Sequence, residues 1–138
     1  YWFWSQSPAF GYYSKPPFIA WAIAATTAVF GDAEWAVRLS APFFQLGAGI
    51  FLYLTARRLA DETVAFWSGL VWLTIPGVFL SAAIITTDGP LLFFWSAALY
   101  LFTRLTDGDE RRPLAVGALL GATVGFGLLS KYAMLYFL

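Results

Sequence analysis

Long apolar runs separated by short charged turns make up most of this chain after residue 16. Four of the runs are long enough to cross a bilayer as helices, which takes about 20 apolar residues. We predict these spans at about 38–57, 64–85, 89–104 and 113–131. Pro76-Gly77 lies inside the second run and predicts a kink there, because proline removes a backbone donor and clashes with the preceding turn.

An earlier apolar run, 17–31, is too short to cross the hydrocarbon core and fits an interfacial helix. Pro16-Pro17 stands at its start and Gly31-Asp32 at its end, as is common at helix termini. Residues 1–16 precede it as a predicted external loop that is rich in aromatic side chains. The expected fold class is all-α, a polytopic membrane helical bundle in which residues 1–138 form one partial transmembrane domain.

The composition makes lipid the natural solvent. Hydrophobic residues account for 60% of the chain and charged residues for 12%, about half the charged share of a soluble domain. The net charge is zero, so the basic surface that nucleic acid requires is missing. The sequence contains no cysteine or histidine, which excludes thiolate nucleophiles and imidazole-ligated metals. The sequence indicates no particular cofactor. A divalent cation such as Mg²⁺, Mn²⁺ or Ca²⁺ would have to bind through oxygen ligands.

The basic residues predict an orientation in the membrane. The turns ARRLADE and TRLTDGDERR carry five of the eight lysines and arginines, so the positive-inside rule places both turns in the cytoplasm. The stretches GYYSKPP, ITTDGP and SKY then share the extracytoplasmic face. Lys15, Asp88 and Lys131, which lie far apart in the sequence, are thereby predicted on one membrane surface.

Each of these ionisable residues has an ordinary structural explanation beside a functional one. Lys15 either anchors the chain among lipid headgroups or binds a lipid phosphate, and the double proline favours phosphate because it fixes the adjacent backbone. Asp88 either caps the helix that Pro90 begins or serves as an active-site carboxylate. Lys131 reaches the outer interface if the fourth span ends near Leu129.

Two further patterns have simple structural interpretations. Glu34 and Arg38 are four residues apart, which predicts an ordinary helical ion pair. Gly117, Gly121 and Gly125 form a ridge of small residues in the fourth span, which favours close packing against another helix.

Three stretches resemble, in order, parts of the family-39 glycosyltransferases: YWFWSQSPAFGYYSKPPFIAW, TTDGPLLFFWSAALYLF and GFGLLSKYAML. These enzymes are bacterial relatives of dolichyl-phosphate-mannose protein mannosyltransferases and of lipid A aminoarabinose transferases. The resemblance implies a GT-C membrane core in the bacterial inner membrane, with its active site on the extracytoplasmic side. It also implies a polyprenyl-phosphate sugar as donor, of hexosyl or pentosyl type, and a lipid, glycan or protein as acceptor.

The resemblance also assigns roles to individual residues. It implies donor-phosphate binding for Lys15 and Lys131 and a catalytic acidic position for Asp88. Tyr12 and Tyr13 are candidates for contact with the isoprenoid or the sugar, although the sequence favours a place for them in an aromatic belt at the interface. The family's Asp-Glu pair is expected just upstream of Tyr1, so the 138-residue piece alone is expected to be inactive.

Two other classes of function remain open at this point. A secondary transporter fragment shares the broken apolar runs, but its sites lie near the bilayer midplane, where these runs are almost free of ionisable groups. A non-catalytic membrane assembly subunit suits the glycine ridge and leaves the Lys-Pro-Pro loop unexplained.

Overall fold

The computed structural model is all-α, as predicted, and describes residues 1–13, 15–106 and 111–138. Ser14, in the predicted external loop, and residues 107–110, in the predicted cytoplasmic turn, lie outside the described residues. In chain order the elements are α1 (Trp2–Ser5), α2 (Phe18–Phe30), α3 (Glu34–Arg38), α4 (Ser40–Leu59), α5 (Glu62–Thr74), α6 (Pro76–Ala83), α7 (Asp88–Thr106), α8 (Pro113–Ser130) and the 3₁₀ helix η1 (Tyr132–Phe137).

Local sequence signals explain several helix ends. The carboxylate of Asp61 caps α5 by accepting a hydrogen bond from the backbone N–H of Val64 at 2.9 Å. Pro76 and Pro113 stand in the first turns of α6 and α8, where a missing N–H costs nothing. Gly31 ends α2 with φ at 79°, a conformation that favours glycine.

The kink predicted at Pro76-Gly77 is present. Helix α5 ends at Thr74, Ile75 is extended, and α6 starts at Pro76 with its axis bent by 57° from that of α5. Both α5 and α6 contact α4.

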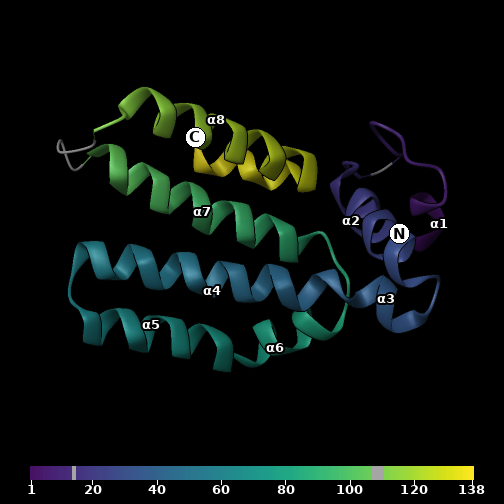
Figure 1. Cartoon of the computed structure of the whole chain (residues 1–138), viewed down its shortest axis with the longest axis horizontal. Coiled ribbons are helices and arrows are strands. Elements are labelled where there is room, and N and C mark those ends of the chain that lie inside the picture. Colours follow the sequence, from purple (N-terminus) through teal and green to yellow (C-terminus); the bar gives the residue numbers. More distant parts are fainter. Residues whose placement is uncertain (14, 107–110) are drawn as a thin grey trace.

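Helix α4 lies at the centre of the long helices. It packs between α5 and α7, and α7 packs in turn against α8 (Figure 1). Phe18, in the first turn of α2, joins the N-terminal helices to this layer: its ring meets Phe44 of α4, Phe94 of α7 and Phe126 of α8, with centroids 5.0–6.2 Å apart. The start of α2 is therefore fixed to three helices at once.

Two helical stretches of the described residues are long and apolar enough to cross a membrane, Glu34–Leu59 and Pro113–Ser130. The bent α5–α6 pair makes a third if it is counted as one span. Helix α7 forms where the 89–104 span was predicted, but it begins with Asp88 and carries Arg104 in its last turn, and it is not among these candidates. That α7 crosses the membrane stays a prediction. Helix α2 is a shorter apolar helix at the place predicted for the interfacial segment.

The two ends of the bundle differ as the charge pattern predicts. In Figure 1 the α4–α5 turn, the end of α7 and the start of α8 lie at one end. The α6–α7 connection, the end of α8 and helices α1–α3 gather at the other. The fold thus brings the described residues of GYYSKPP, ITTDGP and SKY to a common end. The side of the membrane on which that end lies stays a prediction.

The glycine ridge is not used for packing among the described residues. A β-carbon added at Gly117, Gly121 or Gly125 would meet nothing within 4 Å. Helix α8 contacts α7 and η1 through other positions, including the buried Val124. The helix partner that the ridge predicts is therefore not found in the described part of the chain.

Candidate functional site

Asp88 and Lys131 form an ion pair that joins the start of α7 to the end of α8. Lys131 Nζ lies 2.5 Å from Asp88 Oδ1, although 43 residues separate the two in sequence. The Asp88 side chain is 51% exposed and the Lys131 side chain is 38% exposed, so both can be reached by a ligand. An exposed pair of this kind stabilises a fold by about 1 kcal/mol or less. The pair matters for the site because it places an ammonium group and a carboxylate side by side.

The backbone positions both members of this pair. Asp88 is the first residue of α7, and the Gly89-Pro90 dipeptide that follows it is buried. The Lys131 N–H donates to the Gly127 carbonyl at 2.9 Å, and the extended Lys131 backbone then directs the chain into η1. An ammonium group has three donors, so Lys131 retains hydrogens for an anion after it has paired with Asp88.

The capping role considered for Asp88 does not appear in the hydrogen bonding. Within the described residues, Asp88 Oδ1 accepts from Lys131 Nζ, and no backbone N–H of the first turn of α7 donates to the side chain of Thr87 or Asp88. The carboxylate is turned toward the lysine instead.

Lys15 lies in the loop just before α2. Its side chain is half-buried, the two prolines after it are buried, and it forms no ion pair within residues 1–13, 15–106 and 111–138. Phe18, three residues later, holds the start of α2 against α7 and α8, the two helices that supply Asp88 and Lys131. The structure therefore pairs two of the three predicted site residues and brings the third to their end of the bundle.

The two tyrosines before Lys15 have different environments. The Tyr12 ring stacks on Trp4 with centroids 4.9 Å apart, and its hydroxyl bonds to backbone groups of Ala9 in the loop and Trp4 in α1. The Tyr13 side chain is fully exposed. A contact with isoprenoid or sugar stays a prediction for both, and Tyr13 is the one whose side chain is unobstructed.

The described residues offer no group of three or more Asp, Glu, His or Cys side chains that could hold a metal ion. A divalent cation at this end would therefore need ligands from other parts of the protein in addition to Asp88.

Gln45 is a polar residue of this end that the sequence interpretation overlooked. Its side chain is 2% exposed, Nε2 donates to Ser81 Oγ at 2.7 Å, and its backbone carbonyl accepts from Trp72 Nε1 at 3.1 Å. A β-carbon on Gly89 would lie 4.0 Å from the amide nitrogen, so Gln45 lies beneath the first turn of α7. An amide inside an apolar run was the signal that could have identified it.

Two further ion pairs among the described residues have structural roles. Arg38 and Glu34 form the predicted helical pair at 2.6 Å. Toward the opposite end, Glu62 joins Arg57 at 2.9 Å and accepts a hydrogen bond from the Tyr53 hydroxyl, which ties α5 to α4.

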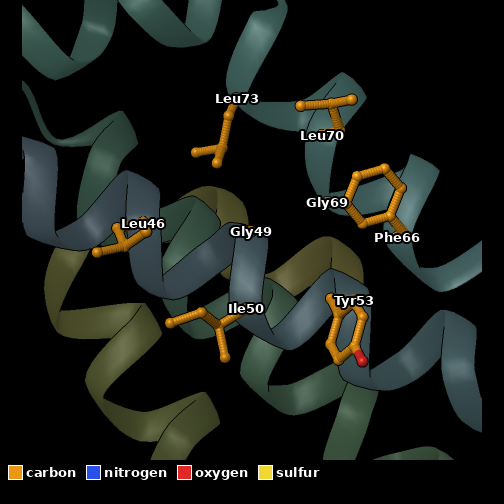
Figure 2. A pocket seen from close by; sticks show the side chains of 8 residues that line it. All are labelled: Leu46, Gly49, Ile50, Tyr53, Phe66, Gly69, Leu70 and Leu73. Carbon is orange, nitrogen blue, oxygen red and sulfur yellow. The ribbon is translucent and has the colours of Figure 1, made fainter. Parts of the chain in front are cut away.

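A pocket of about 260 Å³ lies between α4 and α5 (Figure 2), and neither Asp88 nor Lys131 is among the residues that line it. Apolar side chains and two glycines line it, and Tyr53 supplies its single hydroxyl: Leu46, Gly49, Ile50, Tyr53, Phe66, Gly69, Leu70 and Leu73. It carries no charged group for chemistry.

Comparison with known proteins identifies relatives of the chain. Residues 14–138 match the sequence profile described as dolichyl-phosphate-mannose-protein mannosyltransferase. The chain is 42% identical over 99% of its length to a lipid A galacturonosyltransferase of Rhizobium johnstonii, and 35% identical over 94% to a lipopolysaccharide core galacturonosyltransferase of the same organism. It is 28% identical over 87% to the undecaprenyl phosphate-alpha-4-amino-4-deoxy-L-arabinose arabinosyl transferase of Yersinia enterocolitica.

The chain spans only 28%, 26% and 22% of the length of these three relatives, respectively. No solved structure matches it.

Proposed function

Because the chain belongs to the dolichyl-phosphate-mannose-protein mannosyltransferase family of GT-C membrane glycosyltransferases, we propose that its full-length protein is a polyprenyl-phosphate-dependent glycosyltransferase. The proposed reaction takes place at the extracytoplasmic face of the bacterial inner membrane. The observation that carries the proposal is the Asp88–Lys131 pair, together with the packing of Phe18, three residues after Lys15, against the two helices that supply this pair. Family membership favours this function over the transporter fragment and the assembly subunit.

The two lysines suit a phosphate leaving group. As the acceptor hydroxyl attacks the anomeric carbon, the bond from that carbon to the phosphate oxygen breaks and negative charge grows on the phosphate. Lys15, which has no carboxylate partner among the described residues, stabilises this charge. Lys131 adds a second cation whose position Asp88 holds.

A carboxylate takes the proton of the acceptor hydroxyl as general base. Asp88 is one candidate, and the acidic pair that the family resemblance implies is the principal one.

The relatives suggest both substrates. The two galacturonosyltransferases are named for lipid A and for the lipopolysaccharide core, and both are more similar to this chain than the arabinosyl transferase. We therefore propose galacturonic acid as the transferred sugar and a lipopolysaccharide-type saccharide as the acceptor.

The test uses the full-length protein in membrane vesicles, with polyprenyl-phosphate galacturonic acid as donor and lipid A as acceptor. Lys15→Ala should insert normally and lose most of the transfer activity, and Lys15→Arg should recover part of it, because guanidinium keeps the charge and changes the geometry. Arg38→Gln is the matched control, since it removes a cation already paired with Glu34. Full transfer by an inserted Lys15→Ala protein would leave Lys15 as a lipid anchor.

A further inference from the structure

We propose that Tyr12 is a positioning residue that determines where Lys15 presents its ammonium group. The inference rests on the proposed function for the role of Lys15, and on the hydrogen bonds of residues 4–21 for the role of Tyr12.

The Tyr12 hydroxyl closes the loop between α1 and α2. It accepts a hydrogen bond from the backbone N–H of Ala9 at 3.1 Å. It lies within donating distance of two carbonyls, those of Trp4 at 2.9 Å and Ser7 at 3.1 Å, and its one hydrogen serves one of them at a time. The ring is nearly parallel to the Trp4 ring, at 10°. One side chain is therefore bonded to the loop backbone at Ala9 and, at any one time, to the backbone of either Trp4 in α1 or Ser7 in the loop.

The loop that Tyr12 closes is also tied to the helix after Lys15. Trp21 of α2 donates from Nε1 to the Ala9 carbonyl at 3.0 Å, so Ala9 is held through its N–H by Tyr12 and through its carbonyl by α2. Removal of the Tyr12 hydroxyl would break the hydrogen bond to the Ala9 N–H and leave the one from Trp21 to the Ala9 carbonyl.

Lys15 lies between these two supports. On the N-terminal side, the backbone N–H of Tyr12 donates to the Lys15 carbonyl at 3.3 Å. On the C-terminal side, Pro16 and Pro17 are buried and Phe18 packs against α7 and α8. Because the Lys15 side chain has no ion-pair partner within the described residues, its location depends on this backbone.

This support matters because the donor phosphate can then bind the Lys15 ammonium group while the loop is already ordered. A bound geometry that is already present lowers the entropic cost of binding and keeps the reacting groups aligned. Tyr12 thus acts on the donor through Lys15 and need not touch the donor itself.

The experiment compares Tyr12→Phe with Ser7→Ala in the full-length protein. Tyr12→Phe keeps the stacking ring and removes the hydroxyl that makes the hydrogen bonds. Ser7→Ala removes a hydroxyl from the same loop and leaves those bonds intact, because Ser7 takes part through its backbone carbonyl. We expect Tyr12→Phe to lower kcat/KM for the polyprenyl-phosphate sugar about tenfold, the effect of one or two lost hydrogen bonds, with much of the loss in KM. Ser7→Ala should match the parent protein.

A double-mutant cycle separates positioning from general destabilisation. In a Lys15→Ala background, Tyr12→Phe should cause little further loss, because the group that it positions is gone. An equal loss in both backgrounds, or a Tyr12→Phe protein as active as Ser7→Ala, would overturn the proposal.

Hydrogen exchange gives a readout that does not depend on activity. The Ala9 and Tyr12 amides should exchange faster in Tyr12→Phe than in Ser7→Ala, and unchanged exchange would overturn the proposal. If Lys15→Ala itself retains full transfer, the proposed function of Lys15 fails, and exchange alone then decides whether Tyr12 holds the loop.

Discussion

Gly127 should be the glycine of α8 that tolerates a side chain least. A β-carbon there would lie 2.7 Å from both Cγ and Sδ of Met134 and 3.1 Å from its Cε. Met134 is fully buried and belongs to the core cluster with Leu91 and Ala98, so its side chain has little room to move away. Gly127→Ala is therefore expected to push η1 off α8.

The size of the effect follows from two opposing terms. Replacing glycine by alanine inside a helix gains about 1 kcal/mol, and forcing extra carbon into a packed core costs about 1–3 kcal/mol. Gly125→Ala is the matched control, because a β-carbon at Gly125 meets nothing within 4 Å. The helix term is similar in the two variants, so Gly127→Ala should be less stable than Gly125→Ala by about 1–3 kcal/mol.

The assay is guanidinium unfolding of the detergent-solubilised protein, followed by tryptophan fluorescence. Met134→Ala removes the three atoms that would clash, so the penalty of Gly127→Ala should shrink in that background. Gly127→Ala should also disturb the site around Lys131. The N–H of Lys131 is bonded to the Gly127 carbonyl, and the N–H of Met134 is bonded to the Lys131 carbonyl. Equal stability of Gly127→Ala and Gly125→Ala would refute this account of η1 packing.

Two other predictions concern the site and its side of the membrane. Asp88→Asn removes the charge opposite Lys131. Because the pair is partly exposed, the free energy of unfolding should change by no more than about 1 kcal/mol, while transfer by the full-length protein should fall strongly. Unchanged transfer would leave Asp88 without a role in the reaction. Single cysteines at the exposed Tyr13 and Tyr132, in a protein otherwise free of cysteine, should react with an impermeant thiol reagent added to intact cells, and one at Ala60 should not. Labelling of Ala60 from outside would reverse the proposed orientation.

The amino-acid pattern alone determined the helical class, the position of most helices and the break at Pro76. These features are local, since hydrophobic run length, proline and glycine act within a few residues of where they stand. The common end for Lys15, Asp88 and Lys131 also followed from the sequence, because the number of helices between them and the charge of the turns specify which end each one occupies.

Only the tertiary structure decided which side chains meet at that end. Asp88 faces Lys131 because α7 and α8 pack with one particular rotation and axial offset, which hydropathy does not encode. Tyr12 and Tyr13 are indistinguishable as adjacent aromatic residues, yet the backbone path of the loop turns one onto Trp4 and leaves the other exposed. The glycines of α8 differ in the same way, since Gly127 receives Met134 while Gly121 faces open space. Each of these differences depends on helix packing or on the path of the loop. A pattern of apolar and polar residues along the chain predicts neither of them.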